Sequence, residues 1–356
     1  MTCLGTKVLV ASDFKDLSYH VGALGRNTLW VCDTNTSKMV RPLPVPNVVM
    51  ESGEGSKNYA SVERIISTAV ENSLGRDCTF IALGGGVVSD ITAFAASIYM
   101  RGCRVVLIPT TLIAMTDASI GGKTCVDFRY TKNLIGTFFP ANEVLICADC
   151  LKSLPNRDLS NGLAEVIKHS LLAKDDGLFN LLATSKQRIL EKDTQTLGDL
   201  VRMSLEVKRS FVEPDPYDRL GIRAALNLGH TFAHALESLS RLQWTHGQAV
   251  AWGICRAMQA SLEMGLCSAQ FAQGVEKLIQ FYGYDTKYRI SRSDWMDYRR
   301  HLQRDKKAVM NVVKFVLLTG QGEIKQTELG DDLIKKLVMM PSFLRIGNRH
   351  TLEPIF

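Results

Sequence analysis

Short apolar runs rich in β-branched residues alternate with helix-like segments along the first part of the chain. The runs that resemble buried strands are Lys7–Ala11, Leu29–Cys32, Val45–Met50, Thr79–Leu83, Arg104–Ile108 and Glu143–Ala148. Helix-like segments such as Tyr59–Ser73 and Ser89–Ser97 lie between several of them. This alternation predicts a parallel sheet covered by helices, and therefore an α/β domain over residues 1–154.

The pattern changes near Leu154 and Pro155. Long amphipathic stretches with a period of 3.6 residues follow, namely Leu163–Leu172, Leu197–Phe211, Ala224–Leu239 and Ala249–Met264. A strand pair, Val312–Thr319 and Glu323–Thr327, interrupts the helical series. The sequence therefore predicts a mostly α-helical second domain over residues 155–356.

Charge and composition exclude several classes of protein. The 356 residues carry 42 Lys and Arg against 36 Asp and Glu, without a block of like charges, which argues against a nucleic-acid binder and fits anionic ligands. No stretch approaches the roughly 20 apolar residues of a membrane span, and no secretory signal is visible. The nine cysteines are scattered, which predicts reduced thiols and a cytoplasmic protein.

A glycine loop follows one of the predicted strands. Thr79–Leu83 runs into Gly84, Gly85 and Gly86 and then into a helix-like segment. This arrangement puts a helix N-terminus and free backbone N–H groups against a phosphate, although a tight strand-to-helix turn explains it equally well. Hydroxyl residues, glycines and two lysines lie beyond later strands, in Pro109–Thr111, Asp117–Thr124 and Lys132–Asn133. Asp117 stands where an ATP-binding P-loop requires glycine, so that motif is rejected.

Histidines and a glutamate gather in the helical half. His230 and His234 are four residues apart and share a helix face, with Asn227 and Arg223 one and two turns ahead. His246 precedes another helix, and Glu165 shares a face with Lys168, next to His169. Two imidazoles and a carboxylate can hold a divalent metal such as zinc, although histidine pairs on helices are more often solvated or hydrogen-bonded. Spacing alone leaves His230 and His234 as equal candidates.

Several of these segments together are similar to the 3-dehydroquinate synthase family in order and spacing. They are Gly84–Asp90, Arg101–Gly102, Pro109–Leu112, Asp117–Thr124, Lys132–Gly136, Gly162–His169, Leu226–His234 and His246–Gly247. The resemblance runs from about Asp33 to Lys307. It implies an N-terminal Rossmann-like NAD domain, a C-terminal helical metal domain with the active site between them, a homodimer and the second step of the shikimate pathway.

The resemblance also implies roles for individual residues. For the metal, zinc or cobalt, it implies Glu165, His230 and His246 as ligands, and His234 then contacts the substrate phosphate. Around the substrate it implies Asp117, Lys168, Lys208, Arg223 and Asn227, together with Arg101 (reaching in from a partner subunit), Lys123, Lys132, Asn133 and one of Lys306 and Lys307. For NAD it implies Asp33, Asn35, Glu54, Lys57, Gly85, Gly86, Val87, Val88, Asp90, Thr110 and Thr111, with Asp117, Lys123 and Lys132.

The reaction implied by the resemblance suits a site rich in lysine and arginine. The substrate, 3-deoxy-D-arabino-heptulosonate 7-phosphate, carries a carboxylate and a phosphate. A ring hydroxyl is oxidised by NAD⁺, phosphate is eliminated, the ketone is reduced again, and an intramolecular aldol reaction closes the carbocycle. The alternatives are another sugar phosphate cyclase, a metal-dependent polyol or glycerol-phosphate dehydrogenase, and a zinc-stabilised binding module.

Among the departures from the family pattern, two concern the site. Gln248 replaces the usual glutamate after His246-Gly247, so we expect a carboxylate that orients a metal ligand to be absent. Asp218 replaces a glutamate in a segment, Asp215–Arg223, that is one residue longer than usual. The partner of Arg223 is therefore left open.

Overall fold

The computed structural model describes residues 1–39, 45–129, 131–240, 243–303 and 313–339. The chain forms two compact units, one of Met1–Gly162 with Arg188–Arg219 and one of Leu163–Gln187 with the described part of Leu220–Phe356. The expected boundary between residues 154 and 155 stays a prediction. Among the helices of the described residues, none has both the length and the apolar character that crossing a membrane requires.

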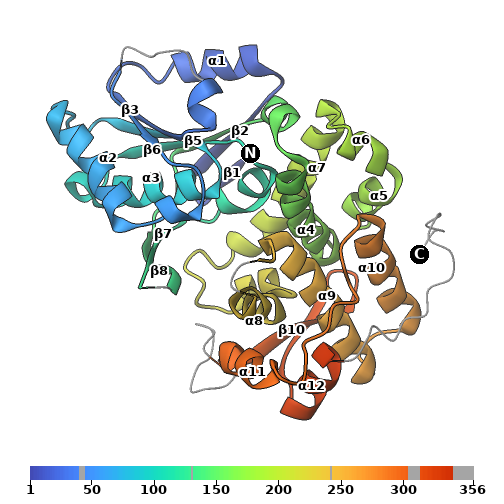
Figure 1. The fold of residues 1–356 in the computed structure, drawn as a ribbon. Coiled ribbons are helices and arrows are strands. Elements are labelled where there is room, and N and C mark those ends of the chain that lie inside the picture. The colour runs from blue at the N-terminus through green and yellow to red at the C-terminus, as the bar shows by residue number, and fades with distance from the viewer. Residues whose placement is uncertain (40–44, 130, 241–242, 304–312, 340–356) are drawn as a thin grey trace. The chain divides into compact units, whose positions relative to one another are not determined.

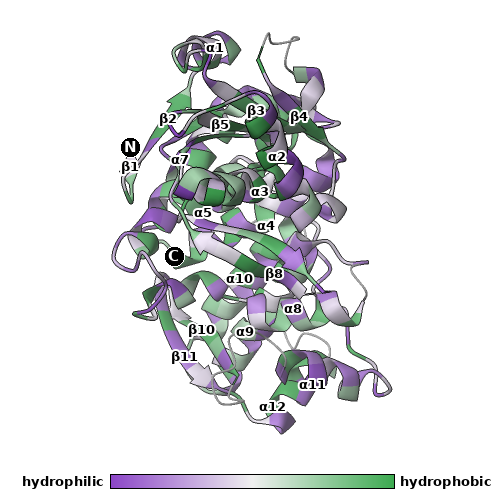
Figure 2. Ribbon diagram, turned by 90° about the vertical axis from the view of Figure 1, so that its left-hand side faces the viewer, coloured by the Kyte–Doolittle hydropathy of each residue, from purple (hydrophilic) through white to green (hydrophobic). Residues whose placement is uncertain are grey.

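The first unit is built on a seven-stranded sheet in which only the pairing of the first two strands is antiparallel. In spatial order its strands are β1 (Thr2–Cys3), β2 (Thr6–Ala11), β9 (Glu143–Cys147), β6 (Arg104–Pro109), β5 (Thr79–Gly84), β3 (Thr28–Asp33) and β4 (Asn47–Met50). All six predicted strands belong to this sheet, so the α/β prediction is confirmed. Figure 2 shows β3, β4 and β5 mostly in the green of hydrophobic residues, as expected for strands in the interior of a covered sheet.

Helices pack on this sheet and bury apolar side chains against it. Helix α1 (Phe14–Gly22) packs against β2 and β9, α3 (Gly86–Ile98) against β5 and β6, and α2 (Tyr59–Glu71) against β4 (Figure 1). Helix α2 buries Val62, Ile65 and Ala69 on one face, and the Asn58 side chain caps its start by accepting the Ser61 N–H at 3.0 Å. Helix α7 (Thr194–Val212) completes the unit.

A two-stranded hairpin, β7 (Lys123–Phe128) and β8 (Thr131–Phe138), was not expected from the sequence. From the sequence, Asp117–Thr124 and Lys132–Asn133 lie beyond strand ends, and no strand is predicted for them. The described side chains of β8 are all exposed or half-buried. A strand that buries so little carries no apolar alternation, and the pattern analysis depends on that signal.

The second unit is mostly helical, as predicted. Its helices are α4 (Asn156–Leu172, from Leu163 onward), α5 (Gly177–Thr184), the first part of α6 (Lys186–Leu190), α8 (His230–Leu239), α9 (His246–Glu263), α10 (Ala269–Phe281), α11 (Trp295–Gln303) and α12 (Asp331–Met339). The predicted strand pair is present as β10 (Lys314–Gly320) and β11 (Glu323–Glu328). Helix α9 contacts α8, α10, α12 and β10, and most of its residues are buried. The core of the unit therefore surrounds α9.

Short helical turns complete the description. They are η1 (Thr36–Met39), η2 (Glu54–Ser56), η3 (Tyr99–Arg101), η4 (Ala114–Ala118), η5 (Ala148–Ser153) and η6 (Ile222–Asn227).

The prediction of one helix over Ala224–Leu239 is wrong. The 3-10 turn η6 ends at Asn227, Leu228 is extended, and Gly229 adopts a left-handed conformation with φ +77° before α8 begins at His230. A Cβ on Gly229 would lie 2.7 Å from the Ile254 backbone nitrogen of α9. Glycine is therefore required both by the backbone turn and by the close approach to α9. The expected turn-by-turn alignment of Arg223 and Asn227 with His230 does not hold.

Candidate metal centre and predicted binding segments

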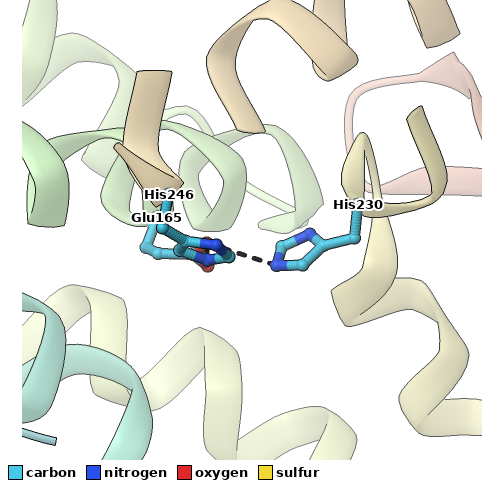
Figure 3. Close-up of side chains that lie close together, drawn as sticks. All are labelled: Glu165, His230 and His246. Carbon is cyan, nitrogen blue, oxygen red and sulfur yellow. Dashed lines mark hydrogen bonds and ion pairs between the residues drawn. The ribbon is translucent and has the colours of Figure 1, made fainter. Parts of the chain in front are cut away.

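Glu165 is the buried acidic group at the centre of the candidate site. It lies on α4 with no exposed surface, and Lys168, one turn later on the same helix and 1% exposed, hydrogen-bonds to its Oε2. Its other oxygen, Oε1, lies 3.4 Å from His230 Nε2 and 3.2 Å from His246 Nε2. Figure 3 shows the three side chains pointing toward one another from three separate helices.

Both histidines occupy the first position of a helix. His230 opens α8 directly after the left-handed Gly229, and His246 opens α9 after the N-cap Thr245. Thr245 and Gln248 form a capping box, in which the Gln248 N–H donates to Thr245 Oγ1 at 3.3 Å and the Thr245 N–H donates to Gln248 Oε1 at 3.0 Å. These local structures fix where each imidazole leaves the backbone.

The second ring nitrogen of each histidine has its own acceptor. His230 Nδ1 lies 3.2 Å from the Leu228 carbonyl oxygen, and His246 Nδ1 lies 3.4 Å from Glu237 Oε1. A proton on Nδ1 satisfies both contacts, so Nε2 is the nitrogen of each ring that would be available to a metal. Both rings are thus oriented as metal-ligating histidines are.

The charges of the site shift its pKa values in opposite directions. Burial raises the pKa of Glu165, but Lys168 and His230 outweigh burial and hold that pKa well below its usual range. Burial lowers the pKa of His230 to about 4, since the attraction of Glu165 offsets only part of it. Burial also acts on His246, yet Glu165 and Glu237 together raise its pKa to about 10. In the metal-free chain, His230 is the neutral ring.

The donor set fits a divalent transition metal. One ligand atom from each of Glu165, His230 and His246 lies within 4.8 Å of the others. Metal–ligand bonds of about 2.0–2.1 Å in a tetrahedron place neighbouring ligand atoms about 3.3–3.4 Å apart. The Glu165 oxygen is 3.4 and 3.2 Å from the two nitrogens. Two imidazoles, one carboxylate and an open fourth position are typical of a catalytic zinc site.

The structure separates the two histidines that spacing left equal. The His234 ring lies edge-on to His230 with centroids 5.5 Å apart, and it is not part of either cluster of potential metal ligands found among the described residues. His230 is therefore the member of the pair that faces Glu165. Arg223 is buried on η6, and Asn227 ends that turn.

In the first unit, several of the predicted NAD segments lie at the carboxyl ends of the central strands of the sheet. Strands β5 and β6 pair so that Gly84 is opposite Pro109, and the Thr110 N–H donates to the Gly84 carbonyl oxygen at 2.9 Å. The glycine loop and Thr110–Thr111 therefore lie side by side beyond the carboxyl ends of β5 and β6. A Cβ on Gly84 would lie 2.6 Å from Val88 Cγ2, so the strand-to-helix turn itself requires glycine there.

The neighbouring strand β3 is parallel to β5, so its carboxyl end lies on the same side of the sheet. The Asp33 Oδ1 atom accepts the N–H groups of Asn35 at 3.0 Å and of Thr36 at 2.8 Å, which closes a tight turn. The Thr36 hydroxyl donates to the Leu83 carbonyl oxygen of β5 at 2.9 Å.

Four of the predicted cations in the first unit pair with carboxylates. Lys57 Nζ lies 2.6 Å from Asp90 Oδ2, Lys208 Nζ 2.7 Å from Asp117 Oδ1, Lys123 Nζ 2.5 Å from Asp218 Oδ2 and Lys132 Nζ 3.8 Å from Glu54 Oε1. Burial raises the pKa of Asp90, while Lys57 opposes this rise. Asp218, one of the residues that depart from the family pattern, thus forms an ion pair with Lys123.

The other predicted substrate-binding residues lie on exposed turns or outside the described residues. Arg101 has φ +66° between Met100 at φ +48° and Gly102 at φ +118°, and this left-handed run carries the arginine on the surface. The Asn133 N–H donates to Asp127 Oδ1 at 2.7 Å in the hairpin. Lys306 and Lys307 lie outside the described residues.

Glu237 is the site residue that the sequence analysis missed. Gln248 leaves no carboxylate at its own position, but Glu237 on α8 places a carboxylate oxygen 3.4 Å from His246 Nδ1. Gln248 serves instead in the helix cap. Glu237 follows His230 by seven residues, two helical turns, so the spacing held a signal for it.

The fold and this cluster define a class of protein in which a mostly parallel α/β sheet accompanies a helical unit with a Glu/His/His group that could hold a metal. Solved structures with this fold include 2-epi-5-epi-valiolone synthase from Streptomyces hygroscopicus subsp. jinggangensis, solved with NAD⁺ and Zn²⁺, at TM-score 0.83 and 25% identity over 95% of this chain and 96% of that one. A 2-deoxy-scyllo-inosose synthase, solved with carbaglucose-6-phosphate, NAD⁺ and Co²⁺, has TM-score 0.81 and 21% identity over 93% and 95%. A probable glycerol dehydrogenase from Sinorhizobium meliloti shares the fold at TM-score 0.67 and 13% identity over 94% and 95%.

Sequence comparison narrows the class. Residues 47–161 match the family description "3-dehydroquinate synthase N-terminal" and residues 162–308 match "3-dehydroquinate synthase C-terminal". The chain belongs to the 3-dehydroquinate synthase family. It is 34% identical over 290 residues to a bifunctional 3-dehydroquinate synthase/phosphatase of Fusobacterium nucleatum. That alignment covers 81% of this chain and 43% of the relative, so the chain spans less than half of the relative's length.

Proposed function

We propose that this chain is a 3-dehydroquinate synthase that converts 3-deoxy-D-arabino-heptulosonate 7-phosphate to 3-dehydroquinate and phosphate, in the shikimate pathway. The observation that carries the proposal is the convergence of Glu165, His230 and His246 in a chain whose two halves both match this family. Lys168, held against Glu165, accompanies the triad in the same unit.

The proposal includes NAD and a divalent metal, zinc or cobalt. Glu165, His230 and His246 would hold the metal. The carboxyl ends of β3, β5 and β6 would hold NAD through the glycine loop, Asp33 and Thr110–Thr111. A bound metal supplies Lewis-acid polarisation of a substrate oxygen. The solved relatives that contain NAD⁺ with Zn²⁺ or Co²⁺ support this choice of cofactors.

The substrate is doubly anionic, and the chain's own residues meet that charge. We assign the carboxylate and hydroxyl groups to Lys168, Lys208, Arg223, Asn227 and Asp117. The phosphate is assigned to His234, Arg101, Lys123, Lys132 and Asn133, with Lys306 or Lys307. Lys123, Lys132 and Lys208 already pair with carboxylates, so their charges are balanced before the substrate binds. In this proposal, an anionic group of the substrate replaces the internal carboxylate as their partner.

The proposal extends to a cytoplasmic homodimer. All nine cysteines are free thiols, which suits a reducing compartment. The arginine presented on the surface by the left-handed run at Met100–Gly102 suits a contribution to a partner's site. Light scattering after gel filtration measures the mass of the assembly directly.

The test is turnover with catalytic amounts of NAD⁺. Metal-loaded protein is incubated with the heptulosonate phosphate, and inorganic phosphate and dehydroquinate are measured together. We expect equal amounts of both products, no net NADH, and loss of activity in chelator that zinc or cobalt restores. Release of neither product by the metal-loaded chain refutes the proposal, and NADH accumulating with turnover indicates a dehydrogenase.

A second candidate is a sugar phosphate cyclase that acts on a substrate without a carboxylate. The structural similarity to 2-epi-5-epi-valiolone synthase favours it. The same assay with a heptulose phosphate lacking the carboxylate separates the two. Lys208→Met should impair turnover of the carboxylated substrate if the assignment of Lys208 to the carboxylate is correct.

A further inference from the structure

His246 differs from His230 in the group that contacts its second ring nitrogen. The Glu237 carboxylate lies 3.4 Å from His246 Nδ1, whereas a neutral backbone carbonyl, that of Leu228, lies 3.2 Å from His230 Nδ1. Glu237 is 8% exposed, so water screens its charge weakly. Of the two imidazoles that would ligate the metal, His246 therefore has an anion next to its Nδ1 atom.

The position of Glu237 follows from α8. Glu237 is seven residues after His230, which places both on the same face of the helix, and α8 packs against α9, the helix that His246 opens. The same short helix thus supplies one metal ligand and the group that contacts the other. Gln248, two residues after His246, forms the capping box of α9 with Thr245.

We propose that Glu237 is a positioning residue of the metal centre, which holds the Nδ1 proton of His246 and strengthens Nε2 as a ligand. The inference deepens the proposed function and rests on its metal centre. A carboxylate that accepts the Nδ1–H of a ligating histidine fixes the tautomer and the ring orientation and raises the basicity of the other nitrogen. Glu237 does not belong to the ligand cluster itself.

The experiment measures metal binding in the full chain, without substrate. Zn²⁺ affinity is measured by competition with a chromophoric chelator, and the visible spectrum of the Co²⁺-loaded protein reports the ligand geometry. Loss of such a partner lowers metal affinity about 10–100-fold. We expect Glu237→Ala to show this loss together with an altered Co²⁺ spectrum. Glu237→Gln keeps an acceptor oxygen without the charge and should lose affinity at the lower end of that range.

Glu263→Gln is the matched control. Glu263 ends α9 and pairs with Lys336 at 2.7 Å. At 1.5 Å per residue it lies about 25 Å along the helix from His246. Glu263→Gln removes one carboxylate charge from the same unit, as Glu237→Gln does, and should leave Zn²⁺ affinity unchanged.

The outcomes separate this inference from the proposed function. Parental Zn²⁺ affinity in Glu237→Gln overturns the inference, as does an equal loss in Glu263→Gln. If Glu237→Ala fails to fold, Glu237→Gln with a parental melting temperature still decides. A chain that binds Zn²⁺ through this network but releases no phosphate refutes the proposed function alone. Turnover in the parent with unaffected metal binding in both Glu237 variants refutes this inference alone.

Discussion

Replacing Glu165 by glutamine tests the electrostatic reading of the metal centre. The change keeps the size of the side chain and removes the charge that faces Lys168, His230 and His246. In the metal-free chain, the Lys168 ammonium, 1% exposed, then loses its anionic partner. We expect Glu165→Gln to weaken both metal binding and the fold itself.

The size of the effect on stability follows from burial. Removing one partner of a buried ion pair costs about 3–5 kcal/mol in the free energy of unfolding. For a unit of this size, each kcal/mol shifts the melting temperature by about 2–4 °C, so the expected decrease is roughly 6–20 °C.

The double variant Glu165→Gln/Lys168→Met provides the control. Removing both charges leaves no buried ion without a partner, so we expect the double variant to recover most of the melting temperature in chelator but none of the Zn²⁺ affinity. Thermal unfolding followed by circular dichroism, with and without Zn²⁺, gives both quantities. A melting temperature of Glu165→Gln equal to the parent's in chelator refutes the reasoning, and so does a double variant less stable than the single one.

Three further predictions follow from the same structure. His230→Ala should lower Zn²⁺ affinity by more than tenfold while His234→Ala leaves it within about twofold, measured by chelator competition; equal losses would contradict the assignment of ligands. Gly229→Ala should lower the melting temperature by more than Gly265→Ala does, because both glycines have a left-handed φ but only the first has α9 within contact distance of the added Cβ. Asp90→Asn should weaken NAD⁺ binding in calorimetry and destabilise the first unit by about 3–5 kcal/mol, since it leaves a buried lysine charge without its carboxylate; unchanged binding would remove this aspartate from the NAD site.

The fold was predictable where burial is one-sided or complete. Six of the seven strands of the large sheet are mainly apolar runs, as expected for strands that helices cover, and such runs stand out in a sequence. No side chain of β8 is fully buried, so the sequence of the β7–β8 hairpin carries no alternation of apolar and polar residues that would predict it. The apolar period across Ala224–Leu239 continued through the break at Gly229, since side chains on both sides of the break face the same core. Periodicity records burial and does not record backbone continuity.

The site was predictable as a set of residue types and only partly as a geometry. The spacing of His230 and His234 placed both on one face, and only the position of Glu165 on another helix distinguishes them. Glu237 escaped notice because its role depends on the packing of α8 against α9, and His246 is nine residues further along the chain. A contact between two helices is invisible to an analysis that examines each helix by itself.

The placement of both histidines at helix N-termini gives a physical reason for the second carboxylate that we propose for the metal centre. Each helix start carries a partial positive charge of about half a unit, which opposes a cation bound to the first residue. Lys168 adds a further full charge next to Glu165. Glu165 balances the lysine, so a divalent ion between α8 and α9 would meet a positive surrounding if no second anion were present. Glu237, buried two turns along α8, supplies that anion without occupying a ligand position. Its charge should therefore contribute to the free energy of metal binding although its oxygen touches only a ligand of the metal.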